Sequence, residues 1–307
     1  MTARTRLAAL LTVPALALTV LTACGEDDPV PASGSATKAS DPADDPTEDP
    51  ADQPSSAAPS ESESESADSG TTTVPVYFVG ETPQGLRLYR EFRSVEGDPA
   101  TGALGLMTSG DALDPDYRTL FPGGSFASVE VGSDAITVGL PDESWTRMGE
   151  MTAKQARLAG QQLVYTAQGV AGSRLPVKVT LDGKPADLFG IGGELTNEPE
   201  VDVRALVNIT APEEGATVDG VLKAAGVASS FEATTPWESR RGGADGKVVK
   251  KGFATAEGWM DKLYPWAAEV DVSGLPAGDY TFVASTDDPS EGEGGGPQVD
   301  TKSITIG

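Results

Sequence analysis

The sequence predicts a mixed α+β domain followed by an all-β sandwich, both placed after an acidic linker. Three observations carry this prediction. Residues 73–198 mix strand-like runs with two helical segments. Residues 199–307 hold seven short strand-like runs between Gly, Pro and Asp turns, with no helical period. Residues 24–72 are rich in Ser, Pro, Ala and acidic side chains and hold few apolar ones, so we expect them to be disordered.

The first residues predict export. Arg4 and Arg6 precede an apolar stretch at 7–21, which has about 15 residues and is shorter than the roughly 20 needed to span a bilayer. The next letters, LTAC at 21–24, resemble the lipobox of bacterial lipoproteins. The resemblance implies that 1–23 is a cleaved signal peptide and that Cys24 carries a diacylglyceryl group. Two acyl chains suffice for stable anchoring, so we expect the protein at the extracytoplasmic face of the membrane. The alternative is an ordinary signal peptide that leaves Cys24 as a free thiol.

The acidic linker predicts a tether. Residues 25–70 contain 13 acidic side chains and one lysine, a net charge of −12 out of −25 for the whole chain. A flexible coil of this length reaches roughly 35–40 Å, which carries the folded part away from the lipid. The alternative is that the Glu-Ser repeat at 61–66 binds cations or a basic partner. The acidic balance also predicts no nucleic-acid partner, because phosphates require clustered Lys and Arg.

The shortage of histidine and cysteine excludes several classes of catalytic and metal site. The chain has no histidine and one cysteine, which excludes Ser-His-Asp and Cys-His nucleophiles and His-ligated metals. We therefore predict no catalytic residue, no cofactor and no metal. Residues 242–248 resemble a phosphate-binding loop only loosely, because Val248 stands where Ser or Thr is needed, and we assign them to a polar loop. Asn208 begins an Asn-Ile-Thr glycosylation triplet, but it lies in a predicted strand.

The first predicted domain begins with strands at 74–79 and 86–92, the second alternating Leu86, Leu88, Arg90 and Phe92 on one face. Asp98-Pro99 opens a short helix that ends near Gly110. Strands at 125–131 and 134–140 are joined through Gly132-Ser133 as a type II′ turn. Thr152 and Gln155 form a capping box that starts a longer helix, whose apolar stripe is Ala156, Ala159, Leu163, Ala167 and Val170. A last strand at 177–181 ends at Asp182-Gly183, and the helices are expected on one face of a small sheet.

Four stretches of this region resemble the GerMN domain of bacterial sporulation and germination proteins. They are VYFV at 76–79, FPGGS at 121–125, AITV at 135–138 and QQLVYT at 161–166. The first helix departs from the pattern because Gly102 and Gly105 interrupt it. The resemblance implies a domain that binds a ligand or a protein and has no established catalytic residues.

The second predicted domain has strands at 203–209, 221–227, 231–237, 247–253, 266–272, 280–285 and 299–306. Its core is expected to contain Trp237, Trp266, Phe282 and Val283. The stretches ASSFEA at 228–233, WAAEVDV at 266–272, LPAGDYT at 275–281 and VDTKSI at 299–304 resemble the immunoglobulin-like domain of bacterial spore germination proteins. This resemblance implies an interaction domain, and the domain pair with an Ala- and Gly-rich composition is typical of actinobacterial envelope lipoproteins. It implies no role in germination itself.

Two acidic features leave alternatives open. Asp287, Asp288, Glu291, Glu293 and Asp300 form either a solvated loop or a Ca²⁺ site. Glu232, expected opposite Phe231 on a strand, either anchors a neighbouring loop or contacts a ligand.

The sequence thus predicts a non-catalytic cell-envelope lipoprotein that binds or scaffolds an envelope protein or peptidoglycan. The alternative is a carboxylate-dependent cell-wall glycan hydrolase, since that chemistry needs only two Asp or Glu side chains about 5–10 Å apart.

Overall fold

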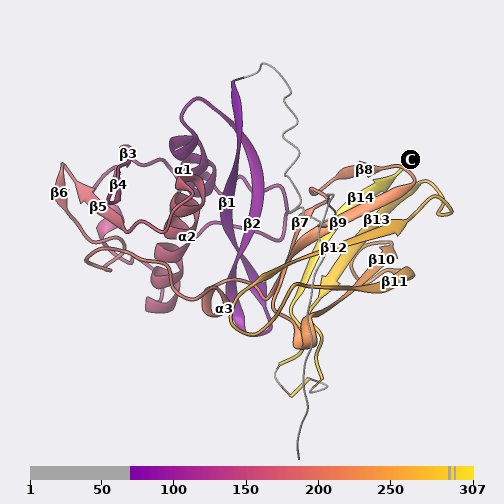
Figure 1. The fold of residues 1–307 in the computed structure, drawn as a ribbon. Coiled ribbons are helices and arrows are strands. Elements are labelled where there is room, and N and C mark those ends of the chain that lie inside the picture. The colour runs from indigo at the N-terminus through magenta and orange to yellow at the C-terminus, as the bar shows by residue number, and fades with distance from the viewer. Residues whose placement is uncertain (1–69, 290–291, 294) are drawn as a thin grey trace, which may run out of the picture. The chain divides into compact units, whose positions relative to one another are not determined.

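The computed structural model describes residues 70–289, 292–293 and 295–307. The predictions for the signal peptide, for Cys24, for the acidic linker up to residue 69 and for Glu291 lie outside these residues. The predicted end of the disordered linker at residue 72 is wrong, because Thr71 and Thr72 belong to the first strand. The described residues fall in a single unit, Glu65–Gly307. Figure 1 shows the first module, residues 73–198, followed along the chain by the β-rich second module, residues 199–307.

A long hairpin opens the first module. Strands β1 (Thr71–Thr82) and β2 (Gly85–Glu96) pair antiparallel around a turn at 83–84. Both faces of the hairpin are covered, because Val76 and Phe78 lie in the main core while Tyr77 and Val79 lie in a second, smaller apolar cluster. Side chains along β2 point alternately to the two faces of the hairpin, as predicted. This alternation does not separate a buried face from an exposed one, because both faces are covered. Glu91 is 7% exposed and Phe92 is 37% exposed.

The two predicted helices begin and end where their caps indicate. Helix α1 (Pro99–Ser109) starts after Asp98, whose carboxylate accepts the Thr101 backbone N–H at 2.8 Å. It ends at Gly110, whose left-handed backbone (φ 71°) suits glycine. Helix α2 (Ala153–Ala171) starts with the predicted capping box of Thr152 and Gln155. Both helix predictions are confirmed.

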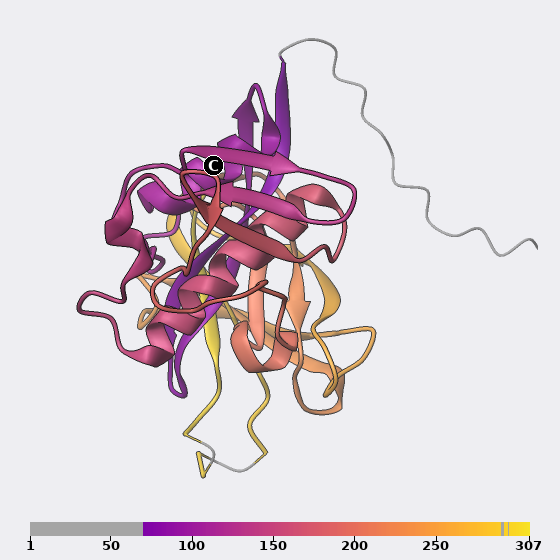
Figure 2. The same cartoon turned by 90° about the vertical axis from the view of Figure 1, so that its left-hand side faces the viewer.

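A four-stranded sheet completes the first module. It has the order β3 (Ser128–Val131), β4 (Ile136–Gly139), β5 (Val177–Leu181) and β6 (Lys184–Pro185), with β4 and β5 parallel and the short 3₁₀ helix η1 (Glu143–Thr146) after β4. The helices pack between this sheet and the β1–β2 hairpin (Figures 1 and 2), rather than on one face of a single sheet. The α+β class is confirmed.

The predicted II′ turn at Gly132-Ser133 is wrong. Val131 pairs with Ile136, and the Gly132 N–H donates to the Ala135 carbonyl at 3.0 Å, so the turn is centred one residue later, on Ser133 and Asp134. Gly132 is also not among the glycines of positive φ, which a II′ turn requires at its first central residue.

The second module is a sandwich of two sheets. After the one-turn helix α3 (Glu200–Val203), one sheet has the order β11-β10-β13-β14-β8 and the other the order β12-β9-β7. The strands are β7 (Val207–Ala211), β8 (Ala216–Val218), β9 (Val221–Ala228), β10 (Thr234–Arg241), β11 (Lys247–Thr255), β12 (Tyr264–Asp271), β13 (Gly278–Ser285) and β14 (Val299–Ile306). The all-β prediction is confirmed.

Three details of the predicted strands are corrected. Val203 belongs to α3, because the first strand begins at Val207. The strand predicted from Phe231 begins at Thr234, since Phe231–Ala233 form the 3₁₀ turn η2 with left-handed backbone at Glu232 (φ 49°). The three-residue strand β8 was not predicted. It adds to the edge of the sheet by parallel pairing with β14.

The predicted core residues of the sandwich are buried to different degrees. Trp266 is 3%, Phe282 0% and Val283 7% exposed. Trp237 is only partly buried and stacks on Phe282 with ring centroids 6.0 Å apart. With no disulfide available, this apolar packing is what holds the two sheets together.

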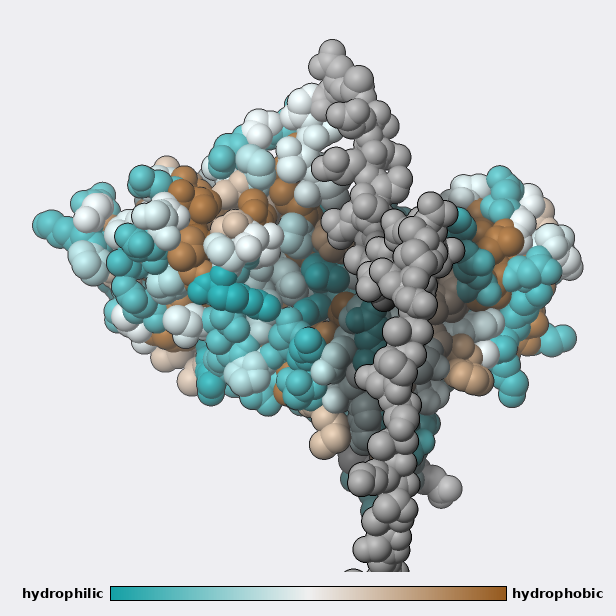
Figure 3. Space-filling view, viewed as in Figure 1, coloured by the Kyte–Doolittle hydropathy of each residue, from teal (hydrophilic) through white to brown (hydrophobic). Residues whose placement is uncertain are grey.

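Hydrophobic side chains on the face shown in Figure 3 lie in small separate groups among polar ones. Over the whole described surface, the most exposed large hydrophobic side chains are Phe253 at 69% and Met260 at 68%. Scattered apolar side chains of this kind are normal on a protein surface. No helix among the described residues is long and apolar enough to cross a membrane.

Candidate functional site

The segment between the two modules, residues 196–206, is hydrogen-bonded to α2 and β2, and we call it the connecting segment. Polar side chains on α2 hold its first half. The Gln161 amide donates to the Thr196 carbonyl at 3.0 Å and accepts the Glu198 N–H at 2.8 Å, and the Tyr165 hydroxyl donates to the Glu198 carbonyl at 2.6 Å. Its second half is held by β2, because the Ala205 N–H donates to the Leu88 carbonyl at 2.9 Å. The connecting segment is thus fixed on the first module, and its residues contribute to two pockets.

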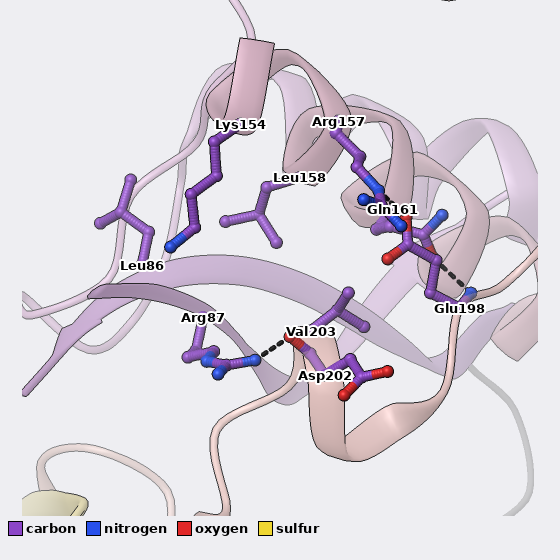
Figure 4. A pocket seen from close by; sticks show the side chains of 9 residues that line it. All are labelled: Leu86, Arg87, Lys154, Arg157, Leu158, Gln161, Glu198, Asp202 and Val203. Carbon is purple, nitrogen blue, oxygen red and sulfur yellow. Dashed lines mark hydrogen bonds and ion pairs between the residues drawn. The ribbon is translucent and has the colours of Figure 1, made fainter. Parts of the chain in front are cut away.

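One pocket, which we call the mixed pocket, combines apolar and charged side chains in a cavity of about 160 Å³. Its apolar wall comes from Leu86, Leu158 and Val203. Figure 4 shows Lys154 extending from α2 toward β2, with Arg157 farther along the same helix. Its lining residues are Leu86, Arg87, Lys154, Arg157, Leu158, Gln161, Glu198, Asp202 and Val203.

Two cations of the mixed pocket are already engaged. The Arg157 Nε donates to Glu198 at 2.5 Å, and this hydrogen bond raises the pKa of the guanidinium. Arg87 donates to the Asp202 backbone carbonyl (Figure 4). The Lys154 ammonium is in none of the ion pairs of the described residues. The arrangement suits a ligand with an apolar part and a single negative charge.

The other pocket, which we call the arginine pocket, has a volume of about 260 Å³. It lies between the C-terminal half of α2, the β1–β2 hairpin and the end of α3. Three arginines from three different elements line it: Arg90 from β2, Arg174 after α2 and Arg204 after α3. Glu200 is its carboxylate, and the rings of Tyr77 and Tyr165 form a wall 5.3 Å apart between centroids.

A buried polar cluster joins the two modules, and we call it the junction cluster: Asp114, Tyr117, Asn208, Asp300 and Lys302. Each of the five is at most 7% exposed. Asp300 accepts four hydrogen bonds, from the Tyr117 hydroxyl (2.7 Å), the Asn208 amide (3.1 Å) and the Ile209 (2.5 Å) and Thr301 (3.0 Å) N–H groups. Lys302 donates to Asp114 and, at 3.1 Å, to the Tyr117 hydroxyl.

Burial and neighbouring charges both shift the pKa values of the junction cluster. Burial raises the pKa of the Asp114 carboxyl to about 6, against the opposing charge and hydrogen bond of Lys302. Burial also lowers the pKa of Lys302, but the charges of Asp300 and Asp114 outweigh it, so that the pKa is raised and the ammonium stays charged. Burial and the same two carboxylates raise the pKa of the Tyr117 hydroxyl well above its ordinary value.

The acidic residues singled out in the sequence do not come together as a cation site in the described part of the chain. Asp300 is 4% exposed and bound within the junction cluster, whereas Asp287 and Asp288 lie beyond the end of β13. Among the described residues no group of three or more Asp, Glu, His or Cys side chains is placed to hold a metal ion.

The remaining predicted positions are placed as follows. Glu232 is exposed in η2, and no hydrogen bond joins its carboxylate to a neighbouring loop within the described residues, so the anchoring role predicted for it is wrong. Residues 242–246 form the loop of the β10–β11 hairpin, whereas Lys247 and Val248, which were also assigned to the polar loop, belong to β11. Asn208 is 1% exposed and hydrogen-bonded, so its amide is not open to a glycan in the folded chain.

Sequence reasoning missed the residues that matter most here: Arg204, Lys302, Asp114 and Tyr117. One signal was available. On the predicted last strand, Asp300 and Lys302 stand at every second position together with Ile304 and Ile306, so the four side chains lie on one face. All four are buried. Two opposite charges on the inward face of a strand indicate a buried ion pair.

Comparison with known proteins identifies the second module. A family model described as the immunoglobulin-like domain of bacterial spore germination (Gmad2) matches residues 206–293, which confirms the prediction for the sandwich. Among solved structures, the chain is similar to the tandem GerMN domains of the sporulation protein GerM from Bacillus subtilis, with 12% identity and a TM-score of 0.33. That match covers 66% of this chain, which spans 63% of the other chain. The GerMN resemblance of the first module rests on its sequence stretches and α+β layers. A search of curated proteins finds no match.

Proposed function

We propose that this protein is a non-catalytic lipoprotein of the cell envelope, anchored through Cys24, that binds or scaffolds an envelope protein or peptidoglycan. The observation that supports a binding role most strongly is the connecting segment, which is fixed by Gln161 and Tyr165 and contributes residues to two pockets. Ligand sites commonly combine an apolar wall with a few placed polar groups, and the mixed pocket has this composition. The immunoglobulin-like second module is of a type found in germination proteins.

The placement of the buried carboxylates favours binding over glycan hydrolysis. A hydrolase needs two carboxyl groups that face its substrate. Asp300 accepts four hydrogen bonds from protein groups, and Glu91 accepts the backbone N–H groups of Leu113 (3.1 Å) and Asp114 (2.9 Å). These carboxylates are engaged in holding the fold.

Co-sedimentation with purified peptidoglycan tests the proposal. Residues 24–307 with Cys24→Ser, which cannot be lipidated, are mixed with the polymer, and the supernatant is analysed for released fragments. Retention without fragments is the expected result for a wall-binding protein, and no retention would direct the search to a protein partner. Release of fragments would contradict the non-catalytic assignment.

The anchor is tested separately by labelling cells with a radioactive fatty acid. The parent chain is expected to carry the label and to fractionate with membranes. Cys24→Ser is expected to lose the label. An unlabelled parent chain would support the ordinary signal peptide instead.

A further inference from the structure

The arginine pocket contains guanidinium groups whose hydrogen bonds are incomplete. Arg204 is 3% exposed, and its Nη1 donates to Glu200 at 3.0 Å. Its Nε and Nη2, together with the Nε of Arg90, are buried and have no hydrogen-bond partner within the described part of the chain. Buried donors in native proteins are almost always partnered, so these three N–H groups indicate that an acceptor belongs in the pocket.

The charge of the arginine pocket indicates the sign of that acceptor. Arg90, Arg174 and Arg204 supply three positive charges, and Glu200 supplies the one carboxylate of the lining. That carboxylate is already shared, since its Oε1 accepts from Arg204 at 3.0 Å and from Arg174 at 3.4 Å, while its Oε2 accepts the Leu263 N–H at 3.2 Å. Two positive charges therefore remain without a counterion in the cavity.

Two neighbouring features do not supply the missing acceptor. The C-terminal end of α2 favours cations nearby, yet no carbonyl of that end accepts from the three unpartnered nitrogens. The rings of Tyr77 and Tyr165 lie 5.3 Å from the Arg204 and 5.5 Å from the Arg174 guanidinium carbons, which stabilises the cations through their faces without forming hydrogen bonds. Burial lowers the pKa of Arg90, and the Arg204 charge lowers it further. A bound anion would oppose both effects.

We propose that the arginine pocket binds a doubly charged phosphoryl group. Its volume of about 260 Å³ accommodates a phosphate with part of the molecule to which it is bonded. Forked guanidinium groups match the oxygens of phosphate in pairs, and a dianion balances the two excess positive charges, whereas a single carboxylate leaves one of them unbalanced. The site lies apart from the mixed pocket, and the inference does not depend on the proposed wall partner.

Titration of the purified full chain with inorganic phosphate tests this site. Calorimetry is done at about pH 8, where phosphate is mostly doubly charged, with sodium chloride holding the ionic strength constant. Saturable binding is expected. Glycerol phosphate, a phosphate ester, should compete with phosphate, whereas acetate should not displace it. If phosphate binds and the ester does not, the site takes free phosphate only.

A matched pair of variants ties the binding to this pocket. Arg174 and Arg147 are both largely exposed and each pairs with a glutamate, but Arg147 lines neither of the two pockets. Arg174→Gln is expected to weaken phosphate binding at least tenfold, while Arg147→Gln leaves it unchanged. Both substitutions alter exposed side chains, so both variants should fold. The proposal would be overturned by absence of saturation in the parent chain, by displacement of phosphate by acetate, or by equal losses in the two variants. Retention on peptidoglycan by Arg174→Gln would separate this site from the proposed function.

Discussion

Lys302 occupies a position where charge and burial conflict. Its side chain is 4% exposed and lies between Asp114 and Asp300, with the ammonium 4.0 Å from the latter carboxylate. It also lies 4.4 Å from the centre of the Tyr117 ring. Its partners come from both modules, so this one side chain connects elements 188 residues apart in the sequence.

Removing the cation should destabilise the fold strongly. Lys302→Met leaves two buried carboxylates without their countercharge, and breaking a buried pair in this way typically costs about 3–5 kcal/mol. Urea unfolding followed by tryptophan fluorescence measures this loss. Adding Asp114→Asn to the same chain should recover part of it, because one uncompensated charge is removed. A loss below about 0.5 kcal/mol, typical of an unimportant surface position, would contradict the role given to Lys302.

The Asp114 carboxyl should leave a signature in the pH dependence of stability. Its pKa is raised from 3.8 to about 6 in the folded chain, so between these values the folded chain binds a proton that the unfolded chain has released. Its contribution to the free energy of unfolding therefore falls as pH rises from about 4 to 6 and is constant above. Each tenfold change in the proton dissociation constant corresponds to about 1.4 kcal/mol.

The measurement compares the parent chain with Asp114→Asn between about pH 4 and pH 7. The free energy of unfolding of the parent, minus that of the variant, is expected to decrease as pH rises. An increase would mean that the charge of Lys302 outweighs burial and that the pKa of Asp114 is lowered.

At the level of elements, the two helix starts predicted from capping side chains were confirmed. Asp98 and Thr152 start the two helices because their side chains satisfy backbone N–H groups within three residues, an interaction contained in the sequence itself. The turn at 132–135 and the start of β10 were wrong by one to three residues. β4 also pairs with the distant strand β5, and the Ala233 carbonyl of η2 accepts from the distant Ala256 N–H, and no local pattern specifies these pairings.

Two glycines of α1 differ in how much space surrounds them, so replacing each by alanine should change the stability of the chain in opposite directions. A Cβ on Gly105 would meet nothing within 4 Å, whereas a Cβ on Gly102 would lie 2.8 Å from the Cβ of Val95. Gly105→Ala should therefore stabilise the chain by up to about 1 kcal/mol through helix propensity. Gly102→Ala should destabilise it by about 1–3 kcal/mol through overpacking.

Thermal unfolding of the two glycine variants checks the difference. The midpoint should rise for Gly105→Ala and fall for Gly102→Ala. Equal shifts of the same sign would mean that the close approach of α1 to β2 at Val95 does not constrain position 102.

At the level of the whole chain, composition and strand spacing were enough to predict an α+β module followed by a sandwich. They were not enough to predict how the modules join. The junction cluster depends on single polar residues such as Asp114, Asn208 and Lys302, which belong to no periodic pattern and lie in separate elements. The arginine pocket was missed for the same reason, because Arg90, Arg174 and Arg204 meet only once the connecting segment is in place.

The junction cluster implies that the two modules unfold together. Differential scanning calorimetry of the purified chain tests it most directly. A single transition is expected, with a calorimetric enthalpy equal to the van't Hoff enthalpy. Two separate transitions, each carrying the enthalpy of one module, would contradict the conclusion that the buried contacts of Asp300 and Lys302 make the two modules one cooperative unit.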